Sequence, residues 1–136
     1  MPRFAANLTM MFNEWPFLDR FDAAADAGFS AVEFLFPYEH SPDAIGRCLS
    51  RNRLTQALFN LPPGDWSTGE RGFAALPGRF GDVQRSVDMA LPFVHATGAR
   101  RLHLMAGIGG GLSHCDRVGS GQGRSRRRRT GDRADQ

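Results

Sequence analysis

Each of four apolar segments of the sequence contains one conspicuous polar side chain. These residues are Asn7, Glu33, Asn60 and His103. Burial of a polar group costs free energy unless the group finds a partner, so four of them on one sheet indicate a polar pocket. An alternative is a set of satisfied buried hydrogen bonds, and for Glu33 the residues favour neither interpretation. Asn60 is the leading ligand-contact candidate, because a Pro-Pro-Gly break follows it.

Two further places could carry chemistry. Glu39 and His40 follow the second apolar segment and precede a helix start, where they could contact a polar substrate or lie in a solvated loop. His103 has no second histidine at ligand spacing, so we do not expect it to bind a metal. The glycines at 109–111 resemble a phosphate loop, but no Lys-Ser/Thr pair or helix follows them, and we reject that function.

An alternation of strands and helices is expected to position these residues. Apolar runs predict strands, and residues at helical spacing between capping and stop signals predict helices. We expect strands over 4–8, 31–36, 54–60 and 101–106, and helices over about 17–27, from Ser41, and over 80–97. The apolar stripe of the last helix is expected to be Val83, Val87, Ala90, Leu91 and Val94. This order predicts an α/β fold with a parallel sheet.

A long segment without helical or strand period separates the third strand from the last helix. It spans residues 61–79 and carries Asp65, Trp66, Glu70 and Arg71. Most connections in compact domains have about 4–6 residues, and longer ones are commonly binding loops. In parallel α/β proteins such loops form sites at the carboxyl ends of the strands.

Composition limits the class of protein. No apolar run approaches the ~20 residues of a membrane helix, and the N-terminus lacks a signal-peptide core. The two cysteines, Cys48 and Cys115, are far apart and lack CxxC spacing, which fits a reducing cytoplasm. Cys48 lies on an apolar helical face, so we expect it to be buried. The sequence thus predicts a cytoplasmic protein that does not enter a membrane.

The basic charge belongs to the last part of the chain. All basic residues are arginines, and residues 109–136 carry a net charge of +4, whereas residues 1–108 carry −1. This Gly/Ser/Arg-rich tail has no apolar period, so we expect it to be disordered. Its arginines could contact nucleic acid, but no aromatic residue is interleaved, and an incidental charged tail is favoured. We interpret 109–136 as out-of-frame sequence, which a reading of the other two frames of the gene would test.

Four stretches together resemble the hydroxypyruvate isomerase family of xylose-isomerase-like TIM barrels. They are FAANLTMMF, GFSAVEFLFPYEH, LFNLPPGDWSTGERGFAALPGR and RLHLMAG, and the resemblance runs from residue 2 to about residue 108. It implies an enzyme that interconverts hydroxypyruvate and tartronate semialdehyde, or related short 2-oxo acids, through an enediolate. It also implies that residues 1–108 form the N-terminal half of such a barrel, with four strands and three helices.

The resemblance implies a substrate-binding role for Asn7, Glu33, Asn60 and His103, with Glu39 and His40 nearby. The catalytic glutamates and the ligands of a divalent metal, which the full-length family commonly uses, come from the second half of the barrel. No position of this chain matches them, so we expect no catalytic residue, no bound metal and no activity of this chain alone. An alternative is a non-catalytic fragment that associates with itself or a partner through open strand edges.

Overall fold

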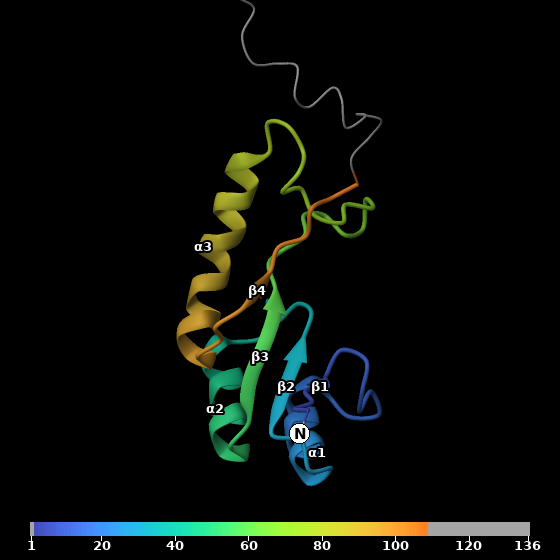
Figure 1. The fold of residues 1–136 in the computed structure, drawn as a ribbon, viewed down its shortest axis with the longest axis vertical. Coiled ribbons are helices and arrows are strands. Elements are labelled where there is room, and N and C mark those ends of the chain that lie inside the picture. Colours follow the sequence, from blue (N-terminus) through green and yellow to red (C-terminus); the bar gives the residue numbers. More distant parts are fainter. Residues whose placement is uncertain (1, 109–136) are drawn as a thin grey trace, which may run out of the picture.

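The computed structural model describes residues 2–108, which form one sheet with helices packed against it (Figure 1). The elements alternate along the chain as the sequence predicts. In chain order they are β1 (Ala6–Asn7), the short 3-10 helix η1 (Phe17–Asp19), α1 (Arg20–Asp26), β2 (Ala31–Phe34), α2 (Pro42–Asn52), β3 (Thr55–Asn60), α3 (Phe80–Thr97) and β4 (Leu102–His103).

The four strands are parallel and lie in the order β1-β2-β3-β4. Asn7 is paired with Glu33 across β1 and β2, and Asn60 with His103 across β3 and β4. Every strand is therefore connected to its spatial neighbour by a crossover, as in successive βα units of a parallel sheet. The α/β fold expected from the sequence is confirmed.

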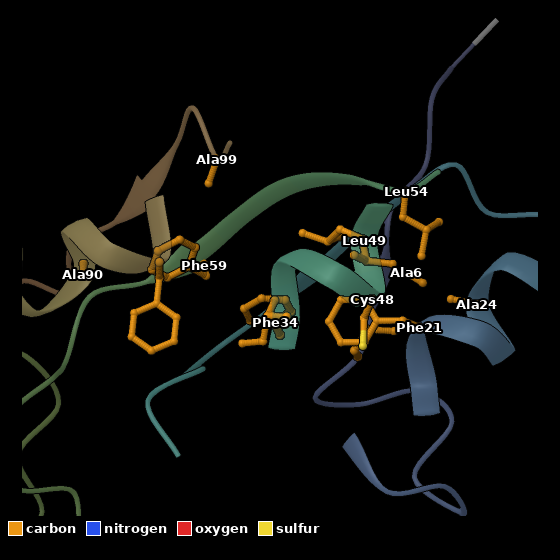
Figure 2. Close-up of a cluster of buried hydrophobic side chains, with 14 of the residues drawn as sticks. Ala6, Phe21, Ala24, Phe34, Cys48, Leu49, Leu54, Phe59, Ala90 and Ala99 are labelled. Carbon is orange, nitrogen blue, oxygen red and sulfur yellow. The ribbon is translucent and has the colours of Figure 1, made fainter. Parts of the chain in front are cut away.

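Alternate strand residues and the helices build one hydrophobic core. Phe34 of β2 is buried against the rings of Phe17, Phe21 and Phe59, with centroid distances of 5.4, 6.0 and 6.2 Å. Figure 2 shows part of this cluster, with Cys48 of α2 among the aromatic and aliphatic side chains. Burial of each such side chain contributes about 1.5–3 kcal/mol. The core thus fixes one face of the sheet, and residues that alternate with it lie on the other face.

Local signals explain where the helices begin and end. Ser41 caps α2, because its hydroxyl oxygen accepts a hydrogen bond from the backbone N–H of Ala44. Arg53 follows α2 in the left-handed conformation, and Gly98, with φ of 66°, ends α3. The predicted bounds of α3 are confirmed at both ends, because its apolar period and its terminal glycine agree.

The predicted apolar stripe of α3 is wrong in part. Its buried residues are Ser86, Ala90 and Phe93, whereas Val87 and Leu91 are exposed. Packing of α3 against α2 sets which side of the helix is buried, and on that side the Ser86 hydroxyl donates to the carbonyl of Val83. The exposed valine and leucine lie on a flank that no other part of residues 2–108 covers.

The last strand is shorter than predicted. Pairing with β3 ends at His103, and Ala106 instead forms an antiparallel bridge with Gly72 of the long loop. Within residues 2–108, β4 has a strand neighbour on one side only, and the bridge to Gly72 takes Ala106 out of the ladder with β3. None of the helices in this range combines the length and apolar character needed to cross a membrane. The tail predicted to be disordered, residues 109–136, lies outside the described residues.

Candidate functional site

The structure brings the four predicted strand residues together. Asn7, Glu33, Asn60 and His103 line one open cavity of about 550 Å³. Each comes from a different strand, and each is next to or alternates with a core residue of that strand. The parallel register places these polar groups side by side on the sheet face that the helices leave free.

Asn7 and Glu33 form the first of two hydrogen-bonded pairs. The amide Nδ2 of Asn7 donates to Glu33 Oε1 at 3.1 Å. The amide oxygen of Asn7 accepts from the backbone N–H of Thr9 at 3.0 Å, which fixes the orientation of the amide. Glu33 is half-buried, and its second carboxylate oxygen remains available as an acceptor.

Asn60 and His103 form the second pair. His103 Nδ1 lies 3.2 Å from Asn60 Oδ1, and because an amide oxygen can only accept, the imidazole carries a proton on Nδ1. The backbone carbonyl of Asn60 accepts the hydroxyl of Tyr38 at 2.7 Å, and burial raises the pKa of that phenol. Asn60 is buried and His103 is exposed. Asn60 is therefore rigidly held, while the second ring nitrogen of His103 faces an accessible region.

Arg101 also lines the cavity, and sequence reasoning missed it. It stands two residues before His103, so the two-residue period of a strand places both side chains on one face. The two-residue spacing between Arg101 and His103 is the sequence signal that places Arg101 on the face of the cavity. Leu58, Met10 and Met105 add apolar surface to the same cavity.

Glu39 and His40 line a neighbouring pocket of about 510 Å³ and not the cavity of the four strand residues. The imidazole of His40 stacks on the ring of Phe17, with centroids 4.7 Å apart and an interplanar angle of 11°. Glu39 is exposed. The structure thus separates the six candidates into a group of four and a group of two, and the substrate-binding role of each stays a prediction.

The long loop between β3 and α3 lies beyond the carboxyl end of β3 (Figure 1). Glu70 organises it by accepting from the backbone N–H of Asp65 at 2.7 Å and from Arg79 at 2.8 Å. The Arg79 guanidinium and the Asp65 amide hold the pKa of Glu70 below its usual value. Arg79 also pairs with Asp82 at the start of α3. The loop is therefore held by its own ion pairs and hydrogen bonds, and its predicted binding role stays a prediction.

The described residues do not fit a metal centre. Within residues 2–108, no three side chains of the His, Cys, Asp or Glu type come close enough to hold a metal ion. Glu33 is the only carboxylate among the residues that line the strand cavity. Cys48 is buried in the core, as predicted, and burial raises the pKa of its thiol. The cavity can orient oxygen-rich molecules through its amide, imidazole and carboxylate groups.

Known proteins with similar sequences carry isomerase names. The 2-oxo-tetronate isomerase of Cupriavidus necator is 59% identical over 108 residues, which are 79% of this chain and 42% of that protein. The protein of the same name from Haemophilus influenzae is 51% identical over the same shares. The hydroxypyruvate isomerase of Escherichia coli is 43% identical over 107 residues, again 79% of this chain and 42% of that protein. No protein-family model matches the chain.

A solved structure supports the same relationship. The crystal structure titled as an AP endonuclease of family 2 from Brucella melitensis matches with a TM-score of 0.80 and 57% identity, over 83% of this chain and 44% of that one. The parallel βα units are thus part of a TIM barrel, as predicted. The chain spans less than half the length of the curated relatives it matches. Over the matched stretch, the predicted resemblance to the hydroxypyruvate isomerase family is confirmed.

Proposed function

We propose that residues 1–108 form the substrate-binding half of an isomerase for short hydroxy-2-oxo acids. One observation carries the proposal. Asn7, Glu33, Asn60 and His103, one from each strand, line a single cavity in the part of the chain that is 59% identical to a 2-oxo-tetronate isomerase. Their donors and acceptors match the carbonyl and hydroxyl oxygens of such acids.

The reaction is an internal redox exchange between neighbouring carbons. In hydroxypyruvate, a proton leaves the hydroxymethyl carbon and the carbonyl oxygen gains one, which gives an enediol. A proton then returns to the former carbonyl carbon while the other hydroxyl loses its proton, and the product is tartronate semialdehyde. No external oxidant or reductant is needed, but an acid and a base must face the two carbons.

The binding groups can hold the two reacting oxygens. Within residues 2–108 the Nδ2 group of Asn60 donates to no acceptor, and on this proposal it donates to a carbonyl oxygen of the substrate. The free carboxylate oxygen of Glu33 and the second nitrogen of His103 are suited to the hydroxyl group. The Asn7 amide is already held by the backbone N–H of Thr9 and the Asn60 amide by His103, so both need little reordering when a substrate binds.

We further propose a four-carbon substrate, 2-oxo-tetronate, over hydroxypyruvate. The relatives named after 2-oxo-tetronate are 59% and 51% identical, and the relative named after hydroxypyruvate is 43% identical. The second carboxylate and the ligands of a divalent cation are proposed to come from the part of the relatives that this chain does not match. On this proposal the 136-residue chain binds substrate but does not turn it over.

A chimera tests the proposal. Residues 1–108 replace the matching stretch of the Cupriavidus necator relative, and isomerisation of 2-oxo-tetronate is followed by proton NMR with Mg²⁺ or Mn²⁺ present. We expect turnover by the chimera and none by the 136-residue chain. His103→Asn and Asn60→Ala should lower kcat/KM by at least tenfold, as expected for loss of a hydrogen bond to the reacting oxygens.

Matched controls come from the same chain. His95→Asn changes an exposed histidine of α3 outside the cavity, and Glu39→Gln, compared with Glu33→Gln, separates the neighbouring pocket from the strand cavity. Equal effects of His95→Asn and His103→Asn would contradict the proposed site. A folded chimera without any turnover would contradict the proposed function.

A second candidate function is association through the open side of the sheet. Large apolar side chains are exposed on α3 and after β4, the strand at the open edge, namely Phe80, Val87, Leu91, Leu104 and Ile108. Exposed apolar patches and unpaired strands favour association. Sedimentation of the 136-residue chain should therefore show dimers or larger species, and Leu91→Glu with Leu104→Glu should shift it toward monomer. A stable folded monomer of the unchanged chain would refute this candidate.

A further inference from the structure

Arg71 is a cation of the long loop that the site described above does not use. Its guanidinium lies on the indole ring of Trp66, with Cζ 3.7 Å from the ring centroid. Nη1 donates to the backbone carbonyls of Trp66 and Glu70, at 3.1 and 2.8 Å. Within residues 2–108, no carboxylate lies within 4 Å of this guanidinium. Its positive charge is therefore not neutralised, and Nε and Nη2 remain as donors.

The acidic residues beside Arg71 are engaged elsewhere. Glu70, the preceding residue, directs its carboxylate to Arg79 and to the amide of Asp65. Asp65 accepts from the amide and the hydroxyl of Ser67. The carboxylates of the loop thus bind other partners, and within residues 2–108 Arg71 has no carboxylate as its partner.

The backbone around Arg71 is fixed. The amide of Gly72 donates to the carbonyl of Pro63 at 2.8 Å, and Gly72 forms a bridge with Ala106. Gly72 has a φ of 96°, and a Cβ atom there would lie 2.2 Å from the carbonyl oxygen of Met105. Only glycine fits this close approach. The stacked arginine is therefore held in place before any ligand arrives, which reduces the entropy lost on binding.

Arg71 also lies at the right edge of the sheet. Trp66 packs on Phe36, which follows β2, with centroids 5.5 Å apart. Gly72 is tied to Ala106, which follows β4, and the neighbouring Met105 lines the strand cavity. The Trp66–Arg71 pair therefore stands beyond the carboxyl ends of the strands, where parallel α/β barrels bind their substrates.

We infer that Arg71 binds the carboxylate of the substrate, with Nε and Nη2 as a two-pronged donor. This inference rests on the proposed function, because it requires a 2-oxo acid. The strand cavity presents Glu33, which repels a carboxylate, and the one cation that lines it within residues 2–108, Arg101, comes from the amino-terminal side of the sheet, so an anionic substrate at the carboxyl ends of the strands needs another cation there. Arg20 is occupied by the oxygens of Leu8, Asn13 and Trp15. Arg101 stands just before β4, at the amino-terminal edge of the sheet.

NMR titration of the 136-residue chain tests the inference directly. The chain contains two tryptophans, so its two indole N–H signals report separately on Trp66 and on Trp15, which serves as the internal reference. The probes are sodium hydroxypyruvate and dihydroxyacetone, which carries a hydroxymethyl group in place of the carboxylate. We expect hydroxypyruvate to shift the Trp66 signal saturably and dihydroxyacetone to leave it unchanged. A Trp15→Phe variant assigns the two signals.

Variants of Arg71 separate charge from structure. Arg71→Gln should raise the Kd for hydroxypyruvate at least tenfold, and Arg71→Lys should give an intermediate value, because lysine keeps the charge but lacks the fork. Arg47→Gln, an exposed arginine of α2, should leave the Kd unchanged. Equal responses to both probes, no response to either, or a Kd unchanged in Arg71→Gln would overturn the inference.

The chimera distinguishes failure of this inference from failure of the proposed function. There, Arg71→Gln should raise KM for 2-oxo-tetronate at least tenfold and change kcat by less than about threefold, since ground-state and transition-state binding are lost together. Arg71-dependent binding with no turnover by the chimera would refute the isomerase proposal alone. Turnover with a KM that Arg71→Gln does not change would refute the role of Arg71 alone.

Discussion

Replacement of glycine by alanine should have opposite effects on stability at Gly46 and at Gly81, because only Gly46 lies where α2 packs against α3. Gly46 lies in α2 where a Cβ atom would be 2.6 Å from the carbonyl oxygen of Ala96 in α3. Gly81 lies in the first turn of α3, where the nearest atom to a Cβ is the flexible end of Arg85, at 3.5 Å. Neither glycine has a positive φ, so the conformation itself accepts alanine at both sites.

The magnitudes follow from two opposing terms. Replacement of a helical glycine by alanine stabilises a protein by about 0.5–1 kcal/mol, and Gly81→Ala should show up to this gain. At Gly46 the same gain is opposed by overpacking against backbone that cannot rotate away, which costs about 1–3 kcal/mol. We therefore expect Gly46→Ala to be less stable than Gly81→Ala by about 1–3 kcal/mol.

Urea unfolding followed by far-UV circular dichroism measures the difference. The slope of the transition should be the same for both variants, because the surface exposed on unfolding barely changes. Thermal midpoints should differ in the same sense, by roughly 4 °C or more for each kcal/mol in a folded unit of this size. If Gly46→Ala stabilises the protein as much as Gly81→Ala does, the close approach of α2 and α3 is wrong.

Two further predictions concern the core and the loop. Phe34→Ala should destabilise the protein by about 3–5 kcal/mol in the same urea assay, because it leaves a cavity among buried rings. Phe4 is 71% exposed, so the control Phe4→Ala should change stability by less than about 0.5 kcal/mol. Arg79 lowers the pKa of Glu70 in the folded loop, so the stabilisation is present above the ordinary pKa of 4.5 and is lost as the pH falls through the lowered value. Trp66 fluorescence in a Trp15→Phe background should report this loosening of the loop between neutral pH and pH 3. In the Glu70→Gln variant the loop should already be loosened at neutral pH. If the Trp66 signal at pH 7 is the same with and without Glu70→Gln, the Glu70–Arg79 contact does not hold the loop.

The order of elements and the gathering of polar residues could be predicted because both follow from short-range pattern. The bounds of α3 depend on a helical period and on Gly98, and the cap of α2 depends on Ser41 and the following proline. The meeting of Asn60 and His103 follows from parallel pairing, since the same register brings equivalent strand positions together. These features require no knowledge of distant contacts.

The remaining features depend on contacts that a linear pattern does not contain. The buried face of α3 includes Ser86 and excludes Leu91, because packing against α2 sets the rotation of the helix. The strand predicted over 101–106 is only two residues long, because Ala106 forms a bridge with Gly72 of the long loop and does not continue the pairing with β3. The stacking of Arg71 on Trp66 likewise depends on a loop conformation that composition alone does not specify.

The two polar pairs explain how one sheet face can be both stable and reactive. The oxygen of each amide already has a fixed partner, Thr9 for Asn7 and His103 for Asn60, which limits the free energy that the empty cavity loses to unsatisfied polar groups. Each pair also keeps unused groups, namely an oxygen of Glu33 and nitrogens of Asn60 and His103, that can bind a second molecule. Both ends of the Asn7 amide already have partners, because Nδ2 donates one of its two hydrogens to Glu33 and the amide oxygen accepts from Thr9. Loss of Asn7 should therefore act through the orientation of Glu33, and Asn7→Asp, which places two carboxylates together, should impair substrate binding more than Asn7→Ser does.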